Sequence, residues 1–328
     1  MAEYLDKWLS EYATDMVSGK TLERYASVIE HHLKPSLGTL PLPKLTPLHI
    51  QAHYTAAVKD GARKDGRKGG LSAQSVLHHH RILSEALRMA VRWQLLIRNP
   101  CDAVEPPAVR TRELPIIDEM QTAWLIEVSQ GTRLYIPILL AVCTGLRRGE
   151  ILGLRWSDFD AVTAAIRVCR SLEETKAHGV RFKEPKGKRA RSVAVPPLLI
   201  EALALYRKEQ DQLKGLFGAD YQDGGLVCCR PDGQVWKPSA FTSAYRALLK
   251  RRKLAGPNFH ALRHSHASHL IKSGVDIKQV SARLGHARAG FTLNQYVHLL
   301  PGQDAEAARR VDSALRKAIE ETRRGRIM

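Results

Sequence analysis

A run of helix-breaking residues between Asn99 and Pro115 limits how this chain can fold. Proline lacks a backbone N–H, has a fixed φ and disfavours a helical conformation in the residue before it. A chain of 328 residues is long enough for two domains with separate hydrophobic cores. We therefore predict that this segment connects two domains. The predicted ranges are 1–105 and 118–300 for the domains, 106–117 for the linker and 301–328 for a C-terminal helical tail.

The hydrophobic pattern changes along the chain. Residues before the linker have helical spacing, and Thr21 is expected to cap the second helix. After the linker, Asp118 and Gln121 have the spacing of a capping box that opens a helix. Alternating residues at 165–169 and 192–195 predict short strands. The expected fold class is mainly α with a small β-sheet, as a helical domain followed by a mixed α+β domain.

The chain carries a large excess of positive charge. Its 51 Lys and Arg exceed its 33 Asp and Glu, giving a net charge of +18 and a pI near 9.9. The basic residues are spread along the whole chain, which favours nucleic acid over an anionic membrane surface as the partner. No apolar run reaches the roughly 18–20 residues that span a bilayer, and the N-terminus lacks a signal-peptide core. We expect no membrane association and a cytoplasmic location.

The cysteines and histidines do not form a recognisable metal or disulfide pattern. Five cysteines without a C-x-x-C pair fit a reduced intracellular protein. His260 and His264 have the i, i+4 spacing of zinc ligands, but the glutamate of HExxH and a third ligand are missing. The run His78-His79-His80 cannot lie on one helix face and is interpreted as incidental. We expect neither a metal nor another cofactor.

Four short segments carry residues suited to chemistry on a phosphodiester. Arginines can neutralise a phosphate, histidines can hydrogen-bond it, and a tyrosine phenol can attack it. Taken singly, each has an ordinary explanation, such as an ion-paired arginine or a packed tyrosine. Their conjunction is far more specific. The residues are Arg147 in T-G-L-R-R-G-E, His260 and Arg263 in H-A-L-R-H, His286 in L-G-H, and Tyr296 ten positions later.

The order and spacing of these segments closely resemble the tyrosine recombinase (phage integrase) family. That family has T-G-x-R-x-x-E, then H-x-L-R-H, then L-G-H, and a tyrosine nine or ten residues later. The resemblance covers the whole chain. It implies that residues 1–105 form a helical core-type DNA-binding domain and that 118–300 form the catalytic domain. A small N-terminal domain for arm-type DNA sites, which many members carry, has no counterpart here.

The resemblance also implies the roles of individual residues. Glu150 would orient Arg147 from one helix turn away. The family's catalytic lysine lies in a turn between two strands, and Lys186 matches it best, with Lys188 as the alternative. The segment Gly290–Thr292 departs from the small polar residues usual in the family. The implied catalytic residues are Arg147, Lys186, His260, Arg263, His286 and Tyr296, and the implied DNA contacts are Lys188, Arg189 and Arg191.

By this resemblance the activity is site-specific DNA recombination without metal or ATP. Tyr296 would form a 3′-phosphotyrosine intermediate at specific sites in double-stranded DNA, to integrate or excise a phage or other mobile element. Four protomers would assemble on DNA, with DNA-bending or directionality factors as further partners, and the amphipathic tail would dock on a neighbouring protomer. A type IB topoisomerase and a non-catalytic DNA-binding regulator are the two alternatives.

Overall fold

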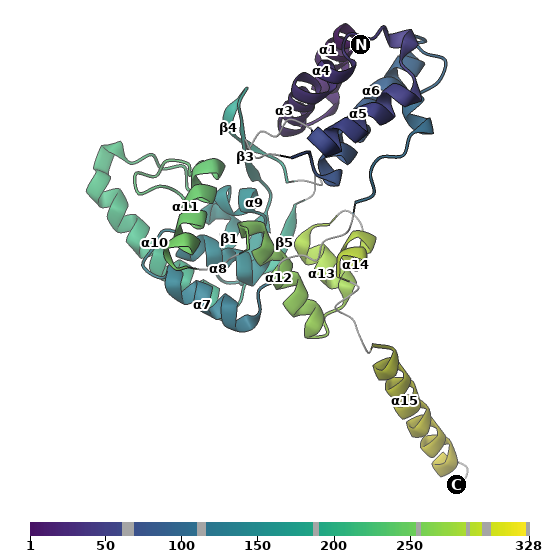
Figure 1. Cartoon of the computed structure of the whole chain (residues 1–328). Helices are drawn as coiled ribbons and strands as arrows, with labels where there is room; N and C mark the ends of the chain where they lie inside the picture. The colour runs from purple at the N-terminus through teal and green to yellow at the C-terminus, as the bar shows by residue number, and fades with distance from the viewer. Residues whose placement is uncertain are drawn as a thin grey trace. The chain divides into compact units, whose positions relative to one another are not determined.

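The computed structural model describes residues 1–60, 69–109, 116–185, 190–253, 257–286, 289–296 and 303–325. It confirms the predicted fold class, since helices dominate and the strands form two small antiparallel sheets (Figure 1). The chain forms two compact units. One comprises Met1–Glu113 with Glu174–Gly179, and the other comprises Leu114–Glu173 with Val180–Met328.

The first unit is built from helices. The helix expected to start at Thr21 instead begins at Gly19, after Ser18, so that prediction was wrong. Ser72 caps the long helix, accepting a hydrogen bond from the Ser75 backbone N–H. The elements are α1 Ala2–Trp8, η1 Leu9–Ala13 (π), α2 Thr14–Met16, α3 Gly19–Val28, η2 Ile29–Leu33 (π), α4 Lys34–Leu37, η3 Leu42–Lys44 (3₁₀), α5 Pro47–Asp60, α6 Ala73–Arg92 and η4 Pro100–Ala103 (3₁₀).

The histidine run in α6 has a structural role that the sequence pattern did not indicate. His79 is buried, and its Nδ1 lies 3.3 Å from Nε2 of His53 on α5. His80 Nδ1 lies 2.9 Å from the hydroxyl of Tyr54, also on α5. Burial lowers the pKa of His53 to about 4, so this histidine is neutral at pH 7. The interpretation of the run as incidental was therefore wrong, because two of its three histidines join α5 to α6.

The second unit combines helices with both sheets. The predicted capping box is confirmed, because Gln121 N–H donates to Asp118 Oδ1 and Asp118 N–H donates to Gln121 Oε1. The helices are α7 Glu119–Ser129, α8 Tyr135–Thr144, α9 Arg148–Leu152, η5 Trp156–Asp158 (3₁₀), α10 Pro197–Phe217, η6 Gly218–Asp220 (3₁₀), α11 Pro238–Arg251, α12 Phe259–Lys272, α13 Ile277–Leu284, α14 Ala289–Tyr296 and α15 Gln303–Gly325.

The strands confirm the two predicted stretches and add three more. Ile166 pairs with Val193, and both are buried, while the neighbouring Arg167 is exposed. The strands are β1 Phe159–Asp160, β2 Ala165–Val168, β3 Ser171–Thr175, β4 Gly179–Lys183 and β5 Arg191–Ala194. They form one sheet of order β1-β2-β5 and a β3-β4 pair. Lys186, Lys188 and Arg189 precede β5 and lie outside the described residues.

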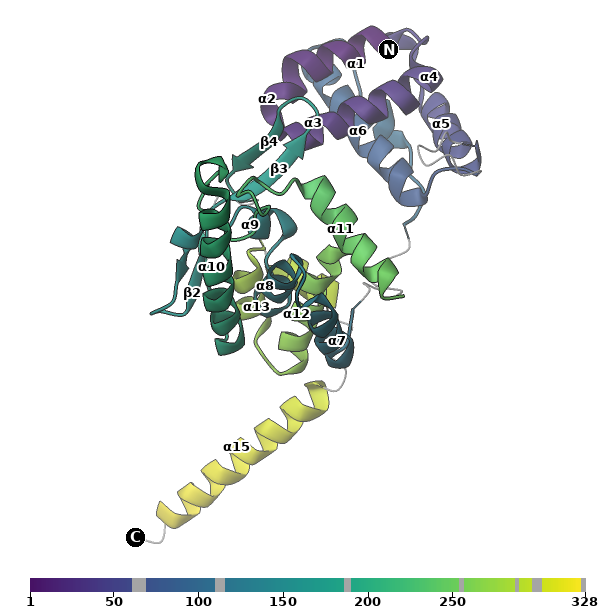
Figure 2. The ribbon, with the colours of Figure 1, turned by 90° about the vertical axis from the view of Figure 1, so that its left-hand side faces the viewer.

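Helix α8 is the centre of the second unit. It packs against α7, α9, α10 and α12, and Figure 2 shows it among these helices. Its apolar residues are buried on all sides, from Ile136 to Ala141, as expected for a helix without a polar face. Since α8 is fixed on every side, its C-terminal end holds the following T-G-L-R segment firmly. None of the helices in the described residues has the length and apolar character needed to cross a membrane.

Candidate active site

Gly145 ends α8 and turns the chain toward Arg147. Its φ of +66° lies in the left-handed region, which glycine adopts without strain. A Cβ at this position would lie 2.6 Å from the His266 ring and 2.8 Å from the Leu284 side chain. The glycine is therefore required both by the backbone turn and by close packing. Arg147 follows in an extended conformation as the N-cap of α9.

Helix α12 brings several of the predicted residues together. Asn258 caps it by accepting a hydrogen bond from Ala261 N–H. His260 is exposed, whereas Arg263 is only 2% exposed. The rings of His260 and His264 meet edge to face, with centroids 4.9 Å apart.

Gly285 ends α13 in the left-handed conformation, with φ +68°, as the sequence predicted. This turn directs His286 toward α14, where its Nδ1 lies 2.7 Å from the hydroxyl of Thr292. Thr292 is fully buried. The sequence suggested that the unusual segment at Gly290–Thr292 would loosen this helix. Instead, the threonine hydroxyl gives the His286 ring a fixed orientation.

Three arginines from distant segments converge on the C-terminal end of α13. The last carbonyls of a helix have no partners within the helix and carry partial negative charge. Here three consecutive carbonyls each accept a hydrogen bond from a different guanidinium group. Arg191 Nε donates to Arg283 O at 3.0 Å, Arg263 donates to Leu284 O at 2.6 Å, and Arg147 donates to Gly285 O at 3.2 Å.

Glu150 is the anion at the centre of this arginine cluster. Its side chain is 1% exposed and forms ion pairs with Arg147 at 2.9 Å and Arg191 at 2.8 Å. Its second oxygen also accepts the backbone N–H of Arg147. Burial acts to raise the pKa of Glu150, but the hydrogen bonds and charges of the two arginines outweigh it and lower that pKa. Glu150 is therefore a carboxylate at neutral pH, and it fixes Arg147 at two points.

Tyr296 lies at the end of α14 in a buried position. Its side chain packs among Ala267, Ile271 and Val280, and the residue is 1% exposed. Its hydroxyl lies 2.7 Å from Nδ1 of His264. Burial raises the pKa of Tyr296 to about 12, although the charge of nearby Arg263 opposes the rise.

The surroundings keep these histidines neutral and the arginines charged. Burial, with nearby positive charges, lowers the pKa of His264 and of His286 to about 4. Burial and the charge of Arg147 lower the pKa of Arg263 to about 9, which still leaves it protonated at pH 7. The site therefore combines fixed positive charge with uncharged hydrogen-bonding rings. Such a combination suits the binding of an anion.

Sequence reasoning missed several residues that complete the site. His264 was considered only as a metal ligand, although its place next to Arg263 in H-A-L-R-H could have indicated a partner for Tyr296. Arg283 donates to the His266 ring and to the carbonyls of Cys143 and Ala194. No pattern in the sequence indicated that role. Lys186, the predicted fifth catalytic residue, lies outside the described residues.

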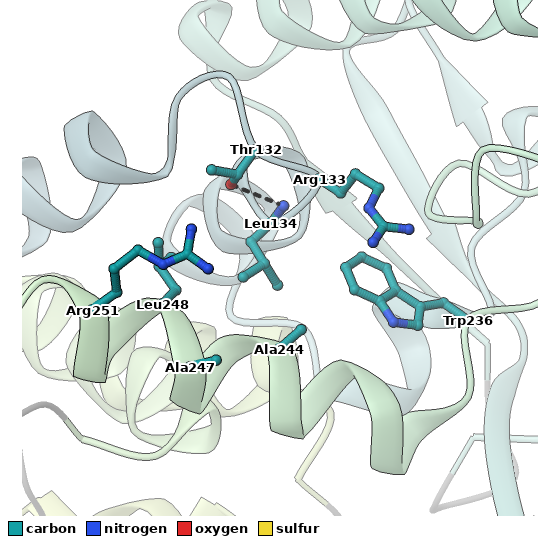
Figure 3. A pocket seen from close by; sticks show the side chains of 8 residues that line it. All are labelled: Thr132, Arg133, Leu134, Trp236, Ala244, Ala247, Leu248 and Arg251. Carbon is teal, nitrogen blue, oxygen red and sulfur yellow. Dashed lines mark hydrogen bonds between the residues drawn. The ribbon is translucent and has the colours of Figure 1, made fainter.

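Two hollows lie elsewhere in the second unit. One, of about 200 Å³, is lined by residues including Leu134, Ala244 and Leu248, and Arg133 lies over the Trp236 ring at 5.4 Å (Figure 3). A larger one, of about 550 Å³, lies between α10 and the residues that precede α8. Neither contains any of the predicted catalytic residues. Within the described residues, no group of His, Cys, Asp and Glu has the arrangement of a metal site.

Comparison with known proteins links this geometry to one family. The phage integrase family model matches residues 114–302, and the model of the phage integrase N-terminal SAM-like domain matches residues 1–56. A tyrosine recombinase XerC-like protein of Caldanaerobacter subterraneus is 28% identical, over 94% of this chain and 81% of that protein. The ICEBs1 integrase of Bacillus subtilis is 29% identical, over 77% of this chain and 69% of that protein.

Solved structures share the fold at low sequence identity. The Tn1549 transposon integrase in complex with a circular intermediate DNA superposes with a TM-score of 0.79 and 18% identity, over 94% of this chain and 98% of that chain. A lambda integrase dimer bound to a COC′ core site gives a TM-score of 0.61 and 19% identity, over 90% of this chain and 94% of that chain. At this level of identity the likeness concerns the fold alone.

Proposed function

We propose that this chain, which belongs to the phage integrase family and is a tyrosine recombinase, uses Tyr296 to cut and rejoin DNA at specific sites. The observation that carries this proposal is the convergence of three site segments. Arg147, Arg263 and the loop before His286 meet at the end of α13, and Tyr296 follows on the next helix. Positive charge is thus concentrated beside a phenol, as attack on a phosphodiester requires.

In the proposed reaction, the Tyr296 oxygen attacks the scissile phosphorus. The new O–P bond forms as the bond to the 5′-oxygen breaks, which leaves a 3′-phosphotyrosine and a free 5′-hydroxyl. Arg147 and Arg263 would hold the nonbridging oxygens and stabilise the charge that grows on them. His260 and His286 would complete the oxygen contacts as neutral donors. Lys186, or Lys188 in its place, would protonate the leaving 5′-oxygen.

The described conformation represents a resting state of this chemistry. A phenol with a pKa about 12 keeps its proton beside an imidazole with a pKa about 4. The hydroxyl is also buried, so a DNA phosphate cannot reach it without a local change. The guanidinium groups meanwhile bind the carbonyls of α13, whose partial negative charge substitutes for the absent phosphate. Binding of DNA would then exchange these carbonyl contacts for phosphate oxygens and release Tyr296 from His264.

Double-stranded DNA is the proposed partner. The net charge of +18 and the DNA-bound states of the transposon and lambda integrases support it. We place the activity in the cytoplasm, with insertion or excision of a phage or other mobile element as its outcome. A homotetramer on two duplexes would exchange the strands, and DNA-bending or directionality factors would assist. The helical domain, residues 1–105, would hold the core site together with the catalytic domain at 118–300, and 106–117 would connect them.

The C-terminal helix α15 provides a surface for this assembly. Val311, Leu315 and Ile319 lie one helical turn apart on one face and are 58%, 57% and 50% exposed. We expect Leu315→Glu to weaken the joining of two DNA sites by about tenfold or more, because a buried leucine contributes about 1.5–3 kcal/mol. Ser313→Glu, which adds the same charge on another face, is the matched control. Equal synapsis by both variants, measured with two labelled duplexes, would exclude this role for α15.

The function itself is tested by supplying one DNA site or two. A site-specific recombinase should exchange strands between two copies of its site and give recombinant products, in EDTA and without ATP. A type IB topoisomerase would instead relax supercoiled DNA without pairing sites, and a non-catalytic regulator would bind without cleaving. Relaxation with no recombinant product, on DNA that carries two copies of the flanking repeat, would contradict the proposal.

A further inference from the structure

Arg191 makes contacts that a DNA-binding side chain on the surface would not need. It is the first residue of β5, and its side chain is only 12% exposed. Both terminal nitrogens bind Glu150, NH1 to Oε1 at 3.1 Å and NH2 to Oε2 at 2.8 Å. The remaining nitrogen, Nε, donates to Arg283 O at 3.0 Å. All three nitrogens of the guanidinium therefore have partners in the protein.

Arg191 also packs on the backbone just before His286. A Cβ placed on Gly285 would lie 2.9 Å from Arg191 NH1 and 3.0 Å from its Cδ and Cζ. The flat guanidinium therefore lies directly against the turn that ends α13. One side chain thus contacts two segments that carry proposed catalytic residues, Arg147–Glu150 and Arg283–His286. Because it begins β5, it also fixes the strand that follows the lysine segment.

We infer that Arg191 is a positioning residue, which holds Glu150 in place and through it fixes Arg147 for phosphate binding. This replaces the expectation that Arg191 contacts the DNA backbone, and it rests on the proposed function. The bidentate fork is essential to the role. A lysine could keep the charge but could not bind both carboxylate oxygens and the Arg283 carbonyl together.

The structure contains a matched control for this test. Glu173 is a buried carboxylate that binds two cations, Arg181 and Lys183, as Glu150 binds Arg191 and Arg147. Arg181→Gln therefore removes one of two cations from a buried glutamate in the β3-β4 pair. It controls for the general cost of breaking such a pair.

The experiment measures single-turnover cleavage of a nicked suicide substrate at saturating protein, with DNA affinity measured separately across a salt series. Arg191→Gln should slow cleavage by about 10- to 100-fold, as is typical when a residue that orients a functional group is lost. DNA affinity should stay within a few-fold and its salt dependence should not change. Arg191→Lys should restore only part of the rate, and Arg181→Gln should cleave like the parent protein.

A double-variant comparison separates positioning from general damage. If Arg191 acts through Arg147, then Arg191→Gln should cost less than about threefold when Arg147 is already alanine. Fully additive losses would overturn the inference. So would a log–log salt slope smaller by about 0.9, which would indicate a phosphate contact. Cleavage by the parent protein in the same assay tests the proposed function independently.

Discussion

Tyr296→Phe is expected to abolish covalent capture of DNA, because the substitution removes the one oxygen that would attack phosphorus. A suicide substrate, with a nick that lets the leaving strand diffuse away, would trap the covalent complex of the parent protein. The variant should give none above background, while its DNA affinity should stay within a few-fold. The phenyl ring should still fill the pocket among Ala267, Ile271 and Val280.

The control for this variant addresses the hydrogen bond that Tyr296 loses. Removing the hydroxyl leaves His264 without that contact, at an expected cost of about 1 kcal/mol in the free energy of unfolding. His264→Gln, which keeps a polar group near the phenol, should therefore retain cleavage. Persistent covalent complex with Tyr296→Phe would show that another side chain is the nucleophile.

The second large effect is expected from Arg263→Ala. Loss of one charged donor to a transition-state oxygen should slow cleavage by about 10²–10³-fold. The buried carbonyls of Gly145 and Leu284, which accept from Arg263 at 2.6 Å, would also lose their partner, so the variant should unfold at lower temperature. Arg263→Lys keeps the charge but cannot reach both carbonyls, and it should rescue cleavage poorly.

Thermal unfolding distinguishes the two consequences of this substitution. Arg170→Ala is a suitable control, because it breaks the ion pair with the buried Asp158, outside the arginine cluster. It should lower stability while leaving the rate of cleavage nearly unchanged at a temperature where it is folded. If Arg263→Lys cleaves at nearly the parent rate, then the guanidinium does not hold the phosphate directly.

Local signals in the sequence predicted much of the architecture. The Asp118–Gln121 capping box and the end of α13 at Gly285 were predicted because each depends on neighbouring residues. Likewise, His260 and Arg263 share a helix because their spacing is close to one turn. The family resemblance then supplied the candidate catalytic set, which no single residue could have indicated.

Long-range contacts could not be predicted in the same way. The row of carbonyls at 283–285 joins arginines that lie up to 138 positions away along the chain, and no periodicity encodes such a contact. Thr292 looked like a departure from the family, yet it orients His286. The histidine pair His53–His79 depends on how α5 packs on α6. In each case, tertiary packing determined the role of the residue.

The central claim, that Tyr296 is the nucleophile, is tested most directly by locating the covalent bond. The parent protein would be trapped on a suicide substrate, digested with a protease, and the peptide that carries DNA identified by mass spectrometry. The account predicts one modified peptide, with the 3′-phosphate of the cleaved strand attached to the oxygen of Tyr296. Attachment at any other residue, or through a 5′-phosphate, would contradict it.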